Sequence, residues 1–383
     1  MPLDHLGLAR WPFPIVPRPE HCTFMADRKT LRDDLTSLIR SFARQDASSI
    51  HLLWSWFGAG KTHTLFYVAN QCALTRQQMG GRLHSVYSEF PKSPRSFLDV
   101  YRAFALGVDT DELIEAYLEI TTSTQSDTLR RTLTAASPDL VTGLHVLATG
   151  SPSDQTTAMR WLWGEALPVG QFRAIGISNK VSSSEEASRI LAALVRLLSL
   201  SSQSQNRPSC RMVWLLDEFQ RIGQLPPRVR DEINTGLHST FNACPAGLSI
   251  VLSFSGKPEK DLPDWFTSEL RDRIGRTKVM VLPPLQPEEA LVFVRDVIAE
   301  LRTLEAYDKP PFFPFDEPTV RFIIDEVRRS EDLKPRSLMH AFNAVLQEAD
   351  PLLQARTISS VSADFARPVL AEHVSLAENE SDA

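Results

Sequence analysis

The first residues whose types and spacing could bind a phosphate form a glycine-rich stretch of eight, Ser55-Trp-Phe-Gly58-Ala59-Gly60-Lys61-Thr62. It follows a short apolar run, residues 49–56, that is typical of a buried parallel strand, and residues 62–72 after it have helical spacing. Glycines let successive backbone N–H groups wrap a phosphate, the Lys61 ammonium adds a point charge, and the Thr62 hydroxyl is a ligand for Mg²⁺. The positive end of the following helix also favours an anion here.

The stretch matches the Walker A pattern except that Ser55 stands where the first glycine is usual. This departure is mild, because that position needs only a tight turn. The alternative is an ordinary Gly-rich turn between a strand and a helix. The sequence predicts a site for ATP and Mg²⁺ whose phosphate-binding residues are Ser55, Gly58, Ala59, Gly60, Lys61, Thr62 and His63.

Two adjacent acids end a second apolar run, Met212-Val-Trp-Leu-Leu216-Asp217-Glu218. An acid at the carboxyl end of a parallel strand reaches the ligand crevice of an α/β sheet. We expect Asp217, together with Thr62, to hold Mg²⁺, and Glu218 to orient the water that attacks the γ-phosphate. Acids often end a strand for no chemical reason, but paired with the glycine-rich stretch they predict ATP hydrolysis, with Lys61 and Glu218 as catalytic residues.

The bulk composition is that of an ordinary globular protein. The length of 383 residues indicates two or three structural units. Hydrophobic residues make up 43% and charged residues 23%, which is typical of a globular protein. The net charge of −6 gives no basic footprint for a dedicated DNA-binding domain. Four scattered cysteines make neither a disulfide framework nor a zinc site. No apolar run approaches the ~18 residues of a membrane span, and no signal peptide is recognisable, so we predict a cytoplasmic protein without a membrane partner.

Strands and helices alternate along the rest of the chain. Strands are predicted at 83–90, 212–216, 248–254 and 278–282, with mostly helical sequence over 97–193 and a Ser-rich linker at 199–209. Helices are predicted at 27–42, 287–301, 317–328 and 336–349. The pattern predicts an α/β fold with a parallel sheet flanked by helices and followed by a small all-α unit.

The order of these motifs resembles the AAA+ superfamily of P-loop ATPases over roughly residues 24–349. The resemblance implies four further site residues. Ser255 (with Ser253 as the alternative) resembles the polar residue that ends the sensor 1 strand, and Arg336, after Lys334-Pro335, resembles the sensor 2 arginine. Arg273 resembles the arginine finger that completes a neighbouring subunit's site, with Arg271 and Arg276 left open. Arg28, in Ala26-Asp27-Arg28, resembles the segment beside the adenine. Each residue also has a purely structural alternative. The arginines at 271–276 are then solvated loop residues, Pro335-Arg336 only begins a helix, and the serines only end a strand.

The resemblance also divides the chain. We expect a Pro-rich N-terminal arm on the domain surface (1–24), an ATPase core (25–284) with a helical insertion at about 95–195, and a helical lid (285–350). A C-terminal tail (351–383) follows, and we expect its last ~20 residues, which are polar, to be frayed. Lys61 and Asp217 are roughly 150 residues apart, further than in a minimal AAA+ core, and the insertion is the excess. An insertion at this place resembles the initiator and signalling (STAND-like) branches. The segment 158–165, followed by 172–177, also resembles ATP-binding proteins of bacterial phage-defence systems such as BREX. The chain as a whole is similar to the ATP-binding proteins of phage-defence or transposition systems.

Three functions fit these observations. The first is an ATP-dependent switch that forms a homo-oligomer through the arginine finger and regulates an unidentified effector in DNA handling or phage defence. The second is a DNA-binding motor or loader of the replication-initiator or transposition-regulator type; nucleic acid would then contact the ATPase surface, the insertion (for example the polar loop 177–184) or a partner. The third is a nucleotide-sensing scaffold that does not hydrolyse ATP, against which Glu218 argues.

Overall fold

The computed structural model describes residues 3–45, 47–79, 83–204, 211–257, 262–274 and 279–381. Contacts divide the chain into two compact units. The first unit consists of residues 1–34, 56–67 and 282–383, and the second of residues 35–55 and 68–281. The helices α1 (Lys29–Arg44) and α2 (Lys61–Met79) each contribute to both units. Because the chain divides in this way, the glycine-rich stretch groups with the C-terminal helices.

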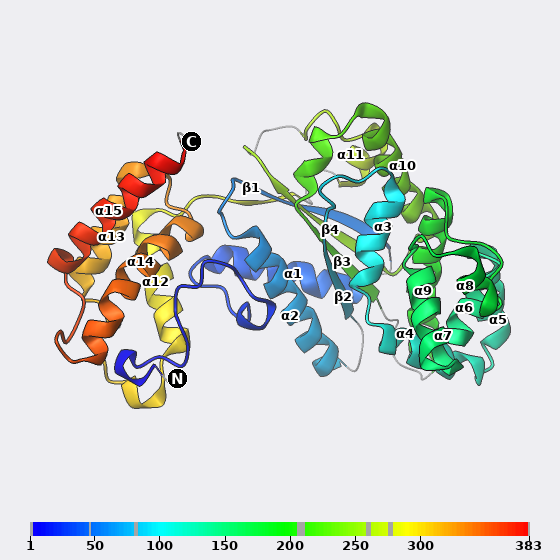
Figure 1. Cartoon of the computed structure of the whole chain (residues 1–383), viewed down its shortest axis with the longest axis horizontal. Helices are drawn as coiled ribbons and strands as arrows, with labels where there is room; N and C mark the ends of the chain where they lie inside the picture. Colours follow the sequence, from blue (N-terminus) through cyan, green and yellow to red (C-terminus); the bar gives the residue numbers. More distant parts are fainter. Residues whose placement is uncertain are drawn as a thin grey trace. The chain divides into compact units, whose positions relative to one another are not determined.

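A five-stranded sheet is the framework of the second unit (Figure 1). Its order is β2-β3-β4-β1-β5, and the pairs β2–β3, β3–β4 and β4–β1 are parallel. The strands have the bounds β1 Ser49–Ser55, β2 Leu83–Glu89, β3 Arg211–Asp217, β4 Leu248–Ser255 and β5 Val279–Leu282. Each strand lies within about a residue of its predicted position. The central strands β3 and β4 are buried along their whole length, as expected for parallel strands covered on both faces.

A block of helices packs against this sheet. α9 is its centre, since it contacts β3 and the helices α3, α4, α5 and α10 (Figure 1). The helices of this unit are α3 Phe97–Leu106, α4 Thr110–Thr121, α5 Ser126–Ala136, α6 Leu140–Thr149, α7 Pro152–Leu162, α8 Val169–Ala174, α9 Ser184–Ser204, α10 Pro227–Ala243 and α11 Ser268–Ile274. The predicted linker at 199–209 is wrong in its first part, because α9 continues to Ser204; its remainder lies outside the described residues.

Four helices with a shared apolar core make up most of the first unit: α12 Pro287–Leu301, α13 Glu317–Ser330, α14 Pro335–Gln354 and α15 Ala363–Ser381. α15 occupies the predicted frayed tail. It contacts α13 and α14 and buries Ala366 and Leu370, so apolar residues at helical spacing outweigh the polar composition of this segment.

The N-terminal arm also differs from expectation. It begins with a 3₁₀ turn at Asp4–Leu6, and Leu6 and Phe13 are fully buried in the core of the first unit. The Phe13 ring lies 5.2 Å from the ring of Phe342 and 6.2 Å from that of Phe315. The arm is therefore part of the hydrophobic core of this unit rather than a segment laid on the surface, because burial of its leucine and aromatic side chains is favourable.

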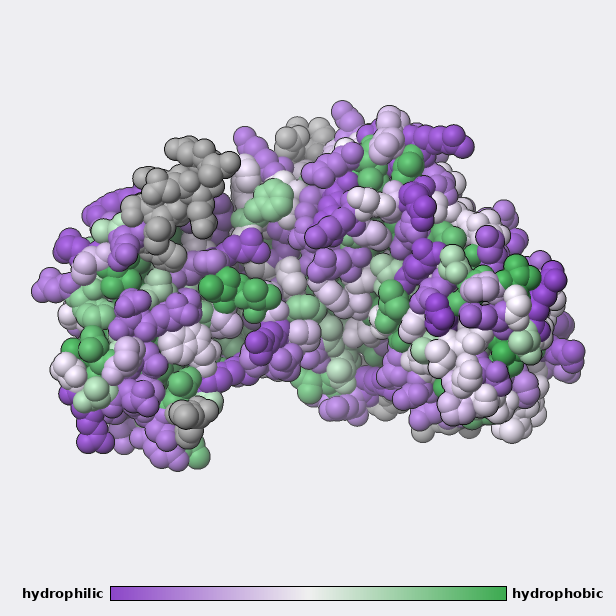
Figure 2. All heavy atoms as spheres, in the orientation of Figure 1, coloured by the Kyte–Doolittle hydropathy of each residue, from purple (hydrophilic) through white to green (hydrophobic). Residues whose placement is uncertain are grey.

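No helix among the described residues is long and apolar enough to cross a membrane. On the face shown in Figure 2, the hydrophobic residues of the helical block form small separate patches between polar ones.

Candidate functional site

The glycine-rich stretch adopts a backbone that only glycine tolerates well. Gly58 has φ +80° and Gly60 has φ +92°, both in the left-handed region. The N–H of Thr64 donates to the Gly60 carbonyl over 2.9 Å and so closes the first turn of α2. Ala59 is buried, and its N–H donates to Trp56. The stretch is thus a tight strand-to-helix loop, and its role in binding phosphate stays a prediction.

The predicted phosphate-binding lysine is folded back along this loop. Lys61 Nζ donates to the Trp56 carbonyl oxygen over 2.9 Å and lies 5.9 Å from the centroid of the Phe57 ring. Only 6% of Lys61 is exposed, whereas Phe57 is 60% exposed. Thr62 is the second residue of α2 and is half-buried. The loop therefore positions one ammonium group and one hydroxyl at the start of the helix.

The predicted sensor 2 residue lies against the same loop, within the first unit. The backbone N–H of Arg336 donates to the Gly58 carbonyl over 3.2 Å. A Cβ atom built on Gly58 would lie 3.3 Å from Arg336 Cβ, and one on Gly60 would lie 3.8 Å from Pro335 Cγ. Pro335 is the first residue of α14, where a proline costs no helical hydrogen bond. The start of α14 is thus fixed beside the phosphate loop.

The segment expected beside the adenine has an unusual backbone. Asp27 and Arg28 are consecutive non-glycine residues with positive φ, +49° and +57°. The Asp27 N–H donates to Asp296 Oδ2 over 3.0 Å, and Arg28 Nη2 donates to the Pro283 carbonyl over 2.9 Å. Burial lowers the pKa of Arg28 and raises that of Asp27. Both residues are half-buried, and their positive φ values are a strained backbone geometry for residues other than glycine.

His63 connects this segment to the phosphate loop. Its Nε2 lies 2.9 Å from the Phe24 carbonyl oxygen, and since a carbonyl only accepts, Nε2 carries the proton. The Phe24 ring meets the imidazole edge-on at 6.5 Å. Burial lowers the pKa of His63, and the nearby Arg28 charge acts in the same direction. The structure therefore brings Arg28, His63 and the glycine-rich stretch together within the first unit; their roles toward adenine stay predictions.

The second unit holds the predicted acids at the carboxyl ends of its strands. Asp217 ends β3, pairs with Glu89 of β2, and is 1% exposed. Its Oδ1 accepts the N–H of Glu218 over 2.8 Å and its Oδ2 accepts the hydroxyl of Tyr87 over 3.3 Å. Burial and the neighbouring carboxylates raise the pKa of Tyr87 well above its ordinary value, which keeps it a proton donor.

Glu218 follows in a left-handed backbone, φ +58° and ψ 29°. Its carboxylate Oε2 accepts Gln220 Nε2 over 2.8 Å and lies 3.4 Å from Arg221 Nη2. Sequence reasoning missed Gln220, Arg221 and Tyr87. The available signal was proximity, because Gln220 and Arg221 lie two and three residues after Glu218.

The sensor 1 candidates lie on the adjacent strand β4. Ser255 is its last residue, pairs with Ser55 of β1, and donates its N–H to Gln220 Oε1 over 3.0 Å. Ser253 is completely buried two residues earlier, inside the strand. Ser255 ends the strand, whereas the register that pairs Leu216 with Leu252 continues to Asp217 and Ser253. Which of the two serines acts as sensor 1 stays a prediction.

The candidates for the arginine finger have different surroundings. Arg271 is bound within its own segment, since its guanidinium donates to the carbonyls of Pro263 and Phe266 and lies 3.1 Å from the Asp264 carboxylate. Arg273 is exposed, and its Nη2 donates to Asn242 Oδ1 over 3.0 Å. Arg276 lies outside the described residues. Arg273 is thus the more exposed of the two described arginines, although it also contacts Asn242 and the Phe241 ring, and its role as a finger stays a prediction.

Two other predicted segments have structural roles in the helical block. The N–H groups of Ser178 and Asn179 both donate to the Asp139 carboxylate over 2.9 Å, so the loop 177–184 uses these groups internally. In the segment 158–165, Trp161 is 2% exposed and packs on Gly143, where an added Cβ would lie 2.6 Å from the indole. Packing accounts for this segment without a ligand.

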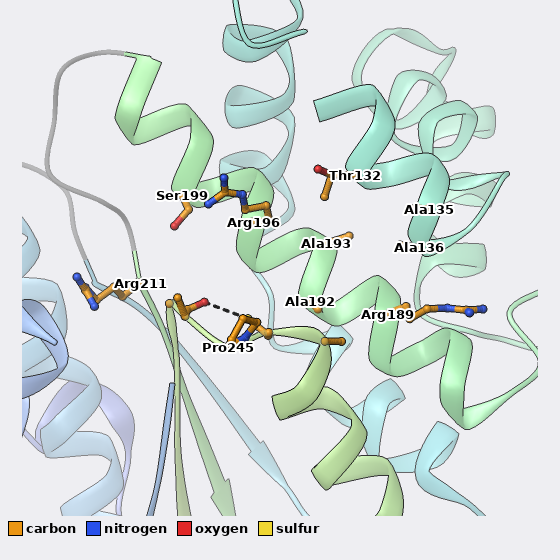
Figure 3. Close-up of a pocket in the computed structure, with 14 residues that line it drawn as sticks. Thr132, Ala135, Ala136, Arg189, Ala192, Ala193, Arg196, Ser199, Arg211 and Pro245 are labelled. Atoms are coloured by element: carbon orange, nitrogen blue, oxygen red, sulfur yellow. Dashed lines mark hydrogen bonds between the residues drawn. The ribbon is translucent and has the colours of Figure 1, made fainter. Parts of the chain in front are cut away.

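A cavity of about 630 Å³ lies at the other ends of the strands, near the starts of β3 and β4, and none of the predicted site residues lines it (Figure 3). Its wall is mostly small and apolar, with three arginines, Arg189, Arg196 and Arg211. In Figure 3 their guanidinium groups point in different directions. The three guanidinium groups therefore do not meet at one point where they could bind an anion together.

The donors present fit Mg²⁺ that arrives with a nucleotide. The described residues contain no cluster of three or more His, Cys, Asp or Glu side chains that would hold a metal unaided. Mg²⁺ usually binds through one or two carboxylates or hydroxyls plus substrate phosphates and water. Thr62 in the first unit carries such a hydroxyl and Asp217 in the second unit carries such a carboxylate, and their joint role as ligands of Mg²⁺ stays a prediction.

Comparison with solved structures identifies the fold. The chain is similar to the Aeropyrum pernix ORC1 protein, solved in complex with DNA, with a TM-score of 0.54 and 13% identity over 95% of this chain and 69% of that one. It is also similar to the Aeropyrum pernix ORC2 protein, solved in ADPNP–ADP complexes, with a TM-score of 0.50 and 16% identity over 91% and 69%. The fold is that of an AAA+ ATPase. No protein-family model and no curated protein matches the sequence.

These similarities confirm the predicted AAA+ fold, with its parallel sheet, flanking helices and C-terminal helical region. They add no support for the resemblance to phage-defence proteins. At these identities they carry the fold alone, so activity and partners remain to be proposed.

Proposed function

We propose that this chain is an Mg²⁺-dependent ATPase that acts on DNA in the manner of AAA+ replication initiators. The observation that carries the ATPase part is the phosphate loop, whose Gly58 and Gly60 have φ near +80° and +92° and whose Gly58 carbonyl accepts the Arg336 N–H. Loops of this geometry cradle phosphates, and Arg336 at this place would add a charge to the γ-phosphate.

The hydrolysis step follows from the second set of residues. Glu218 would accept a proton from water as the water oxygen attacks the γ-phosphorus. The bond between the γ-phosphorus and the bridging oxygen breaks, and ADP leaves with that electron pair. Bound Mg²⁺, held by Thr62 and Asp217, would supply charge neutralisation to the phosphates. Lys61 and Arg336 stabilise the charge on the transferred group.

ATP turnover by the purified chain, with Mg²⁺ and with EDTA, tests the activity. We expect Mg²⁺-dependent release of phosphate that the Lys61→Ala variant lacks. A wild type that binds ATP but releases no phosphate would favour the nucleotide-sensing scaffold instead.

DNA is the proposed partner because ORC1, the similar structure with a TM-score of 0.54, was solved in complex with it. The net charge of −6 means that contacts would come from local basic side chains rather than from the whole surface. Fluorescence anisotropy of a labelled duplex, with ATP and over a salt series, tests this step. We expect the logarithm of the association constant for DNA to fall linearly with the logarithm of the salt concentration. No binding at low salt would contradict the DNA-binding part and leave the ATPase part intact.

A second candidate is a switch that assembles through Arg273 and regulates an effector. The observation that favours it is the contrast between Arg273, which is exposed, and Arg271, which is bound to its own segment. We expect ATP to shift the wild type to a larger species on a sizing column, and Arg273→Ala to lower turnover. Arg228→Ala, an exposed arginine on α10, is the control. A monomer with ATP, or full turnover by Arg273→Ala, would exclude this assembly.

A further inference from the structure

Two side chains that no sequence motif assigns contact the carboxylate of Glu218. Gln220 Nε2 donates to Glu218 Oε2 over 2.8 Å, and Arg221 Nη2 lies 3.4 Å from the same oxygen. Both residues belong to η3, the 3₁₀ helix Phe219–Gln224 that starts directly after Glu218. Neither contact involves the other carboxylate oxygen, Oε1.

The orientation of the Gln220 amide is fixed by its second partner. Gln220 Oε1 accepts the backbone N–H of Ser255 over 3.0 Å. A backbone N–H can only donate, so the oxygen of the amide must face Ser255 and its NH₂ group must face Glu218. One side chain therefore links the carboxylate to the end of β4.

Arg221 makes the corresponding link to β2. Its Nη1 donates to the Phe90 carbonyl oxygen over 2.6 Å and lies 3.6 Å from the Glu89 carboxylate. Arg221 is only 21% exposed, so its guanidinium is held in place. Together, Gln220 and Arg221 connect the ends of β2, β3 and β4 through a single oxygen of Glu218.

Glu218 needs such support because its own backbone is unfavourable. Its φ of +58° is rare for a residue with a side chain, and a glutamate has three further rotatable bonds that would otherwise leave the carboxylate in several positions. A base that abstracts a proton must lie within hydrogen-bond reach of the water in a narrow range of geometry.

We propose that Gln220 and Arg221 are positioning residues for ATP hydrolysis: they hold Glu218 through Oε2 and leave Oε1 directed to the attacking water. Gln220 also couples this geometry to Ser255, so a shift of the end of β4 moves the carboxylate. The inference rests on the proposed ATPase function.

The isosteric substitution Gln220→Glu tests the proposal. A glutamate keeps an oxygen to accept the Ser255 N–H but loses the NH₂ donor and places a like charge beside Glu218. We expect kcat to fall about 10- to 100-fold with little change in the KM for ATP or in the Kd of a fluorescent ATP analogue. Gln220→Met, which loses both hydrogen bonds, is expected to lower kcat as well.

Three comparisons make the result decisive. Gln171→Glu, an exposed glutamine on α8, is the matched control and should turn over like wild type. Arg221→Lys, which keeps the charge, should retain more of kcat than Arg221→Gln. Melting temperatures exclude variants that fail to fold.

If Gln220→Glu turns over at the wild-type rate, or if only Gln220→Met is impaired, Gln220 merely ties β4 to η3 and the proposal is overturned. A parallel loss of ATP affinity, kcat and melting temperature would likewise contradict a positioning role. These outcomes require an active wild type. A wild type without turnover would instead overturn the proposed ATPase function, and with it this inference.

Discussion

The two sets of predicted site residues are built in different ways. In the first unit, the phosphate loop relies on backbone: two glycines with positive φ, and the Gly58 carbonyl bound to the N–H of Arg336. In the second unit, the edge of the sheet relies on side chains. The Asp217 carboxylate accepts a hydrogen bond from the Tyr87 hydroxyl, and the Glu218 carboxylate accepts one from the Gln220 amide. A backbone cradle suits any polyphosphate, whereas a side-chain network fixes one reacting group. We infer that the first set binds the phosphates and, through Lys61 and Arg336, stabilises the charge on the transferred group, whereas the second set positions the attacking water.

The largest expected effect on the binding side comes from Lys61→Ala. A hydrogen bond from a charged group is worth about 1.5–3 kcal/mol, so the affinity for ATP should fall about 10- to 100-fold. Titration with a fluorescent ATP analogue measures this, with the exposed Lys180→Ala as the control. Unchanged affinity would mean that Lys61 does not hold bound ATP, and the division between the two sets would fail.

Gly58→Ala tests the backbone part of the same comparison. An alanine at φ +80° costs about 1–2 kcal/mol, and its Cβ would lie 3.3 Å from Arg336 Cβ. We expect ATP affinity to fall about tenfold as the loop leaves this conformation. Gly170→Ala is the matched control, because nothing lies within 4 Å of an added Cβ there. Equal affinities for the two variants would show that the loop geometry does not control binding.

The smallest effect is a pH dependence of stability. Burial puts the pKa of folded His63 below its ordinary 6.5, so as pH falls the unfolded chain takes up the proton first. His63 therefore supports folding fully above about pH 6.5, and this support declines as pH drops toward the lowered folded pKa. Melting temperatures between about pH 7.5 and 5.5 should fall more steeply for wild type than for His63→Gln. Parallel curves would exclude this role.

The sequence was informative where one physical rule dominates. Continuous apolar runs located the strands, and the glycines of 55–62 could be read as a phosphate loop because few other residues tolerate positive φ. The predictions of a surface arm at the N-terminus and a frayed tail at the C-terminus were wrong. Both were based on the proline-rich or polar composition of these segments rather than on the spacing of their apolar residues, and Leu6, Phe13, Ala366 and Leu370 are buried.

The contacts of Glu218 could not be predicted for a different reason. Gln220 reaches Ser255, 35 residues further along the chain, and Arg221 reaches Phe90, 131 residues earlier. Such partners depend on the strand order, which places β3 between β2 and β4. A motif names the reacting carboxylate, but only the folded sheet shows what holds it.

The most direct test of the division between binding and hydrolysis is to measure ATP affinity and ATP turnover on the same preparation of Glu218→Gln. Loss of a general base lowers turnover about 10²- to 10⁴-fold, while the phosphate loop is untouched, so the Kd for ATP should stay within about twofold of wild type. Turnover at the wild-type rate, or loss of ATP binding together with turnover, would contradict the assignment of Glu218 to the hydrolytic set.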